Sequence, residues 1–180
     1  MFGEDYVHRF DAAAEELADR VRELPGADRV FYTASALGDF GLLWVIFALF
    51  RALRGGKDNE RAAFRGVLAT GIESFLVNIC LKSVFRRARP VEQVEHPLPL
   101  RIPLTSSFPS GHATAAFCGA MLLAENDRLG PFYFLSAVVI AISRVYVRIH
   151  HASDVVGGVI VGLLLGQIGK RLFPLKARRP

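Results

Sequence analysis

"VFYTASALGDFGLLWVIFALF", residues 30–50, contains one charged side chain, Asp39, in 21 positions. A helix needs roughly 20 consecutive, mostly apolar residues to cross the hydrocarbon core of a bilayer. Four further stretches are similarly poor in charge: 66–81, 104–124, 129–143 and 155–169. We therefore expect an all-α integral membrane protein, a helical bundle with about five transmembrane helices.

The composition also indicates one membrane domain. Hydrophobic residues make up 52% of the 180 positions, and the mean hydropathy is +0.31. A soluble domain scatters its apolar residues, whereas this chain concentrates them in long uncharged stretches. Cys80 and Cys118 both lie in apolar stretches, so their positions predict neither a disulfide framework nor a zinc site.

The segment before the first apolar stretch has a different pattern. Between residues 2 and 24, apolar side chains recur every three or four positions and acidic side chains fill the positions between them. This pattern predicts an amphipathic helix that lies in the membrane interface. No cleavable signal peptide is expected. The expected domains are the N-terminal helix and connector (1–28), a transmembrane core (29–174) and a basic tail (175–180).

Three polar clusters interrupt the apolar stretches: "KSVFRRARP" at 82–90, "PSGH" at 109–112 and "SRVYVRIHHASD" at 143–154. They fall at the end of the second span, at the start of the third, and between the fourth and fifth. Because the chain changes side at each span, all three clusters are expected on the same face of the membrane. The sequence therefore predicts that they meet.

The clusters together contain the groups that a phosphate needs. Cationic side chains near hydrocarbon are costly unless an anion compensates them, and a phosphate would compensate Lys82, Arg89 and Arg144. Ser110 and Gly111 precede an apolar run, and a helix N-terminus there would also favour an anion. A phosphate-binding site is the simplest interpretation.

Two histidines are placed to act on such a phosphate. His150 and Asp154 are four residues apart, so on a helix they would share one face. The carboxylate would accept the Nδ1 proton and leave Nε2 as a nucleophile. His112 directly follows Gly111 and would lie beside the anion, whereas His151 would point away from the site and is interpreted as a bystander.

The full pattern resembles the three-part motif of the type 2 phosphatidic acid phosphatase superfamily, in its membrane lipid phosphatase branch. The resemblance implies that His150 is the nucleophile that forms a phosphohistidine, that Asp154 orients it, and that His112 is the general acid and base. It also implies a cradle for the phosphoryl oxygens formed by Lys82, Arg89, Ser110, Gly111 and Arg144. No metal and no cofactor are implied. Larger members have six spans, and here the amphipathic helix takes the place of the first.

Other interpretations of the same residues stay open. The cations could anchor the chain to lipid headgroups, the His150–Asp154 pair could be a structural hydrogen bond, and Ser110 could serve a serine hydrolase. A metal site could be formed by His112, His150, His151 and Asp154. Arg86 and Arg87 are either contacts to a second phosphate or a sugar phosphate, or headgroup anchors. Asp39 and Glu73 are expected to pair with an arginine or with a polar residue such as Asn78.

The expected function is that of a metal-independent lipid phosphatase. Its substrate would be a polyprenyl diphosphate, a phosphorylated polyprenyl-linked sugar, phosphatidic acid or phosphatidylglycerol phosphate. The alternatives are a phosphotransferase that passes the phosphoryl group to a lipid or sugar acceptor, and a non-catalytic lipid-binding or transport protein. The expected partners are this lipid substrate and membrane lipids, with no nucleic acid; the oligomeric state stays open.

The distribution of charge predicts the orientation. The side opposite the clusters carries many cations: Arg51, Arg54, Lys57, Arg61, Arg65, Arg128, Lys170, Arg171, Lys176, Arg178 and Arg179. On the site side, the phosphate-binding cations and those of the acid-rich N-terminal helix are not counted as signals of orientation. The cations that remain as such signals are Arg86, Arg87, Arg101 and Arg148. The positive-inside rule then places the tail in the cytoplasm and the site on the outer face of a bacterial plasma membrane.

Overall fold

The computed structural model describes residues 2–90 and 96–175, with side chains from residue 5 onward. All regular structure in these residues is helical, which confirms the all-α prediction. The helices are α1 (Phe2–Arg22), α2 (Ala27–Gly38), α3 (Leu42–Leu53), α4 (Lys57–Phe75), α5 (Lys82–Val84), α6 (Gly111–Leu123), α7 (Gly130–Tyr146) and α8 (Ala152–Leu172). A 3-10 turn η1 (Asp39–Gly41) joins α2 to α3, and a π-helical turn η2 (Leu76–Leu81) joins α4 to α5.

Within the described chain, three helical runs are long and apolar enough to cross a bilayer. They are Ala27–Leu53, Lys57–Val84 and Ala152–Leu172, with 27, 28 and 21 residues. The other two apolar helices, α6 and α7, have 13 and 17 residues. The bundle therefore contains five apolar helical segments, as expected. At 1.5 Å per residue, however, α6 is only about 20 Å long, which is shorter than the hydrocarbon core of a bilayer.

The helix start expected at Ser110 and Gly111 is confirmed, so only part of the charge-poor stretch 104–124 is helical. Residues 104–110 are irregular, and α6 begins at Gly111. Pro109 disfavours helical backbone at the residue before it, and the Ser110 hydroxyl accepts a hydrogen bond from the Ala113 N–H as the N-cap. The irregular segment instead lines the end of the bundle, where it contributes polar groups to the candidate site.

Helix α6 forms the centre of the bundle, and glycines on α8 allow the two helices to lie in close contact. A Cβ on Gly158 would lie 2.5 Å from the Ser110 carbonyl oxygen, and one on Gly162 would lie 2.4 Å from the Thr114 carbonyl oxygen. A Cβ on Gly166 would lie 2.7 Å from Met121 Cβ. Small residues at four-residue spacing are typical of close packing between transmembrane helices. This packing sets the N-terminus of α8 beside that of α6.

The outer surface of the bundle is apolar, as expected for a protein surrounded by lipid. Large hydrophobic side chains on it are about half exposed or more: Leu49, Phe64, Phe75, Leu135, Ile142, Ile160, Leu164 and Ile168. The interior instead contains fully buried arginines, among them Arg51 and Arg65. Arg51 donates to the carbonyl oxygens of Leu123 and Glu125, and Arg65 donates to that of Leu122. Both arginines therefore satisfy carbonyls that the end of α6 leaves without helical partners.

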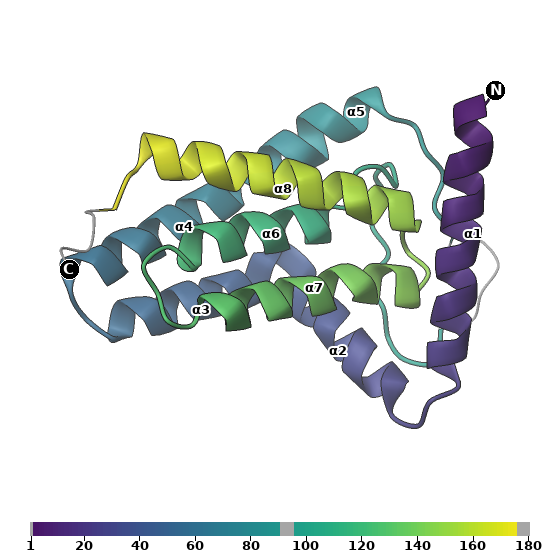
Figure 1. Cartoon of the computed structure of the whole chain (residues 1–180), viewed down its shortest axis with the longest axis horizontal. Coiled ribbons are helices and arrows are strands. Elements are labelled where there is room, and N and C mark those ends of the chain that lie inside the picture. Colours follow the sequence, from purple (N-terminus) through teal and green to yellow (C-terminus); the bar gives the residue numbers. More distant parts are fainter. Residues whose placement is uncertain (1, 91–95, 176–180) are drawn as a thin grey trace.

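Helix α1 lies across the end of the bundle at which α7 ends and α8 begins (Figure 1). Arg22 donates to the carbonyl oxygens of Val145 and Tyr146, and Arg148 forms ion pairs with Glu15 and Asp19. The apolar residues Tyr6, Phe10 and Leu17 on α1 are exposed. An amphipathic helix docked in this way, with part of its apolar face uncovered, fits the interfacial position predicted from the sequence.

Candidate active site

The three polar clusters of the sequence meet at the end of the bundle that α1 crosses. A cavity of about 300 Å³ opens there, and its walls include Lys82, Gly111, His112 and His150. The remaining wall comes from the η1 turn, from α4 and η2, and from residues 101–105. The alternation of spans therefore brings the polar clusters together, as predicted: Lys82 and His150 line one cavity although they are 68 positions apart in sequence.

His150 lies in the turn between α7 and α8 and is almost fully buried. The expectation that His150 and Asp154 share one helical face was wrong, because α8 begins only at Ala152. The two are still close: Nδ1 of His150 is 3.7 Å from Oδ2 of Asp154. His151 is the residue before α8, and its backbone N–H donates to Asp154 Oδ2 at 2.9 Å. Burial lowers the pKa of His150 well below its ordinary value of 6.5, which keeps the imidazole neutral at pH 7.

Asp154 is completely buried and is held by several donors. The hydroxyl of Ser107 donates to its Oδ2 at 2.6 Å and also lies 3.4 Å from Nδ1 of His150. Ser107 thus bridges the carboxylate and the imidazole, a contact that the sequence motifs did not predict. The only signal available was a run of hydroxyl side chains just before "PSGH".

Arg89 is fixed by the irregular segment and points at His150. Its guanidinium donates to the carbonyl oxygens of Thr105, Ser106 and Ile149 at 3.0, 3.0 and 3.2 Å. Its Nη1 atom is 3.1 Å from His150 Nε2. Burial lowers the pKa of Arg89 to about 10, so the side chain is still cationic at pH 7. A positive charge is therefore held next to Nε2 of His150.

Lys82 and Arg144 supply two further buried cations. Lys82 Nζ donates to Thr105 Oγ1 at 3.2 Å, and a Cβ on Gly111 would lie 3.6 Å from the same Nζ. Arg144 is fully buried at the end of α7, and one of its nitrogens donates to the hydroxyl of Ser35. Its Nε and Nη2 have no hydrogen-bond partner among the described residues. A buried guanidinium with unused donors requires an anionic or polar partner.

Ser110 and Gly111 form the start of α6 against the start of α8. The Ser110 backbone N–H donates to the Asp154 carbonyl oxygen at 3.0 Å, and the Ser110 side chain is fully buried. Gly111 lines the cavity. The positive end of the α6 dipole therefore faces the same space as Lys82, which favours an anion there.

His112 lines the cavity, and a carboxylate lies next to its ring. Its Nε2 atom is 3.0 Å from Asp39 Oδ1, and Arg101 lies 3.7 Å from the same oxygen. Gly38 leaves room for the ring, since a Cβ there would lie 2.6 Å from His112 Cδ2. The expected arginine partner of Asp39 is thus present, but its contact with His112 was missed. An acidic residue inside an apolar span was the available signal.

Arg86 and Arg87 are placed differently from each other, and neither lines the cavity. Arg86 is exposed. Arg87 donates to Asp154 Oδ1 at 2.6 Å and to Asp11 Oδ2 at 2.7 Å. Its guanidinium is thus directed to two carboxylates behind His150 instead of to the cavity.

Comparisons with known proteins show the family to which the chain belongs. The model of the PAP2 superfamily matches residues 62–178. The chain is 35% identical over 162 residues to decaprenylphosphoryl-5-phosphoribose phosphatase of Mycolicibacterium smegmatis. This alignment covers 87% of the present chain and 81% of the relative. It is 34% identical over 173 residues to phosphatidylglycerophosphatase B of Bacillus subtilis, covering 88% and 81% of the two chains.

A solved structure shares the fold along nearly the whole chain. The crystal structure of a transmembrane PAP2 type phosphatidylglycerolphosphate phosphatase from Bacillus subtilis matches with a TM-score of 0.73 and 27% identity, and the match covers 97% of this chain and 90% of that one. The family match, the relatives and the fold agree with one another. The chain therefore belongs to the PAP2 superfamily, the family that its motifs resemble, and it is a membrane lipid phosphatase.

Proposed function

We propose that this phosphatase removes a terminal phosphate from a lipid through a phosphohistidine on His150. One observation carries the proposal: Arg144, fully buried near the nucleophile, has two guanidinium nitrogens without a partner among the described residues. Together with Lys82 and Arg89, it supplies donors for the three outer oxygens of a phosphoryl group. Such donors stabilise the charge that these oxygens carry in the transition state.

The first half of the proposed reaction transfers the phosphoryl group to the enzyme. Nε2 of neutral His150 attacks phosphorus, the bond from phosphorus to the leaving oxygen breaks, and His112 gives its proton to that oxygen. Asp154 accepts the Nδ1 proton in a hydrogen bond and stabilises the positive charge that develops on the ring. The contact between His112 and Asp39 holds the acid in position.

The second half returns the enzyme to its starting state. His112, now neutral, takes a proton from a water molecule, whose oxygen attacks phosphorus. The bond between phosphorus and Nε2 breaks, inorganic phosphate leaves, and His150 is again neutral. The protons balance, because the one that His112 gave to the alcohol is replaced by the one that it takes from water.

We infer the substrate class from what two relatives act on according to their names. Decaprenylphosphoryl-5-phosphoribose and phosphatidylglycerol phosphate differ in their lipid chains. Both carry a small polyol that is joined to the lipid through a phosphodiester and ends in a phosphomonoester. A lipid of this form is the proposed substrate, in preference to a polyprenyl diphosphate or phosphatidic acid.

We further propose that the site faces outward from a bacterial plasma membrane. The count behind this orientation needs one correction, because Arg51 and Arg65 are buried structural residues and carry no topological signal. Arg54 forms an ion pair with Asp127, and five other cations remain at that end within the described residues: Lys57, Arg61, Arg128, Lys170 and Arg171. At the site end, Arg87, Arg101 and Arg148 form ion pairs with acidic residues, so the bias toward the opposite end persists.

The experiment is phosphate release by the purified protein from a panel of lipids, without an added acceptor and with excess chelator present. We expect the greatest kcat/KM with the phosphorylated polyol lipids, and inhibition by vanadate as a mimic of the transition state. Release only after an alcohol acceptor is added would indicate a phosphotransferase. Release only from diphosphates would overturn the substrate class, and rescue by zinc or magnesium would favour the metal interpretation.

A further inference from the structure

A buried carboxylate in the wall of the cavity has no role in the phosphate chemistry. Glu73 lies on α4, lines the cavity, and is only 2% exposed. Its Oε1 atom has no hydrogen-bond partner among the described residues. The side chain also borders an apolar groove between α4 and α8, where the wall includes Leu68, Cys118 and Leu165. An ionisable group in such a place is costly and marks a functional site by default.

A negative charge on Glu73 would have the wrong sign for phosphate binding. A carboxylate near the phosphoryl site repels the substrate anion. Lys82 attracts the Glu73 carboxylate, but Lys82 is already one of the groups assigned to phosphate. A carboxylate does suit hydroxyl groups, because each of its oxygens accepts hydrogen bonds from them. The unpartnered Oε1 therefore indicates a ligand with O–H donors.

The residues beside Glu73 form a polar strip along the same helical run. Thr70, Ser74 and Asn78 follow one another at four-residue spacing, and all three line the cavity. Asn78 Nδ2 donates to Ser74 Oγ at 3.2 Å, and a Cβ on Gly111 would lie 3.4 Å from Asn78 Oδ1. The strip thus runs from the start of α6, where the phosphate is proposed to bind, to Glu73.

The strip also lies on the side of the cavity expected for the leaving group. In-line attack by His150 places the leaving oxygen opposite the nucleophile, within reach of His112. From His112 the wall continues through Gly38 to Gly41, and a Cβ on Gly41 would lie 2.5 Å from Thr70 Cγ2. The carbon chain attached to the leaving oxygen would therefore lie between His112 and the strip that contains Glu73.

We propose that Glu73, with Asn78 beside it, binds a hydroxyl group of the substrate's polyol and so selects phosphorylated polyol lipids over lipid phosphates without one. This inference rests on the proposed function and deepens it. A site built to bind a hydroxyl through a buried charged group rejects the analogue that lacks it, because the group is left unpaired. We expect a preference of about 10- to 100-fold in kcat/KM, the range of one hydrogen bond to a charged group.

The test compares two lipids that differ by one hydroxyl: phosphatidylglycerol phosphate and its analogue with 1,3-propanediol in place of glycerol. We expect the wild type to prefer the glycerol compound and Glu73→Gln to lose most of that preference. Because the propanediol compound has no hydroxyl to bind to residue 73, its kcat/KM should fall less than that of the glycerol compound, and the ratio of the two values is the readout. Glu60→Gln is the matched control, since Glu60 is an exposed acid on the same helix.

Two results would overturn the inference. In one, Glu73→Gln slows both lipids equally, as expected if Glu73 only balances the charge of Lys82; in the other, the preference is unchanged. If Glu73→Gln does not fold, Asn78→Ala is tested with the same two lipids, and we expect it to reduce the preference for the glycerol compound. Asn78 is exposed and lines the cavity, so its replacement leaves the core unchanged. A wild type that hydrolyses neither lipid but hydrolyses other lipid phosphates would contradict the proposed function instead.

Discussion

Arg87 donates a hydrogen bond from Nη1 to Oδ1 of Asp154 at 2.6 Å. Its other terminal nitrogen, Nη2, donates to Asp11 on α1 at 2.7 Å. Asp11 also accepts the backbone N–H of Ser153 at the start of α8. The N-terminal helix is therefore connected, through one guanidinium, to the carboxylate that faces the candidate nucleophile.

This connection predicts that Asp11 is a positioning residue. In Asp11→Asn, Arg87 is held less firmly and Asp154 loses part of its support, so we expect kcat to fall about 10-fold with KM nearly unchanged, as for groups that orient a catalytic side chain. Glu16→Gln is the control, because Glu16 is an exposed acid on the same helix whose partner is Arg20. Steady-state kinetics in detergent measures both. A rise in KM with constant kcat would show that Asp11 acts on substrate binding instead.

A second prediction concerns the contact between His112 and Asp39. If His112 protonates the leaving oxygen, Asp39→Asn should slow esters of alkyl alcohols about 10-fold or more, within the range that general acid catalysis contributes. Esters of p-nitrophenol leave without protonation, so their rate of phosphoryl transfer should hardly change. The ratio of the two rates in single turnovers is the measurement. Equal losses on both esters would argue against the proton-donor role.

A third prediction uses the pH dependence of kcat/KM. Burial is the main cause that lowers the pKa of His150, and the charge of Arg89 contributes in the same direction. Neutral His150 is the reactive form, and because its pKa is lowered well below 6.5, its protonation removes activity only well below pH 6.5. In Arg89→Gln one lowering influence is lost, and the acid limb should move to higher pH. The substrate phosphate also titrates near pH 6, but it is the same in both enzymes, so an unmoved limb would contradict the assignment.

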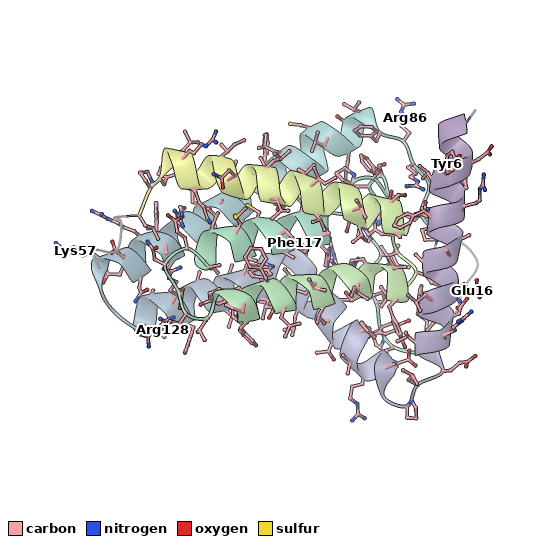
Figure 2. All side chains as sticks on the ribbon, in the orientation of Figure 1. Tyr6, Glu16, Lys57, Arg86, Phe117 and Arg128 are labelled. Carbon is pink, nitrogen blue, oxygen red and sulfur yellow. The ribbon has the colours of Figure 1, made fainter. Side chains whose placement is uncertain are left out.

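A fourth prediction concerns orientation. Arg86 and Lys57 lie at opposite ends of the molecule (Figure 2), and both are exposed. In a background without Cys80 and Cys118, Arg86→Cys should react with a membrane-impermeant maleimide on intact cells. Lys57→Cys should react only after permeabilisation. The reverse pattern would place the site at the inner leaflet.

The sequence was sufficient for the residues whose chemistry depends on local spacing. Lys82, His112 and His150 could be placed at one cavity from short motifs, because the alternation of spans alone brings the motifs to one end. The supporting contacts could not be predicted, since they join distant segments: Ser107 lies 47 residues from Asp154, and Asp11 lies 142 residues from Ser153. Absence of charge could not show that residues 104–110 are irregular, since charge-poor segments look alike whether they are helical or irregular, whereas Pro109 and Ser110 did mark the helix start.

The most direct test of the account is a search for phosphate on His150. Wild-type protein is mixed with substrate labelled in the terminal phosphate, quenched in alkali within one turnover, and digested for mass spectrometry. We predict a phosphohistidine at residue 150, stable in alkali and labile in acid, which His150→Ala lacks along with all turnover. Phosphate release by His150→Ala at a near-normal rate, or a turnover in wild type without label on His150, would contradict the account.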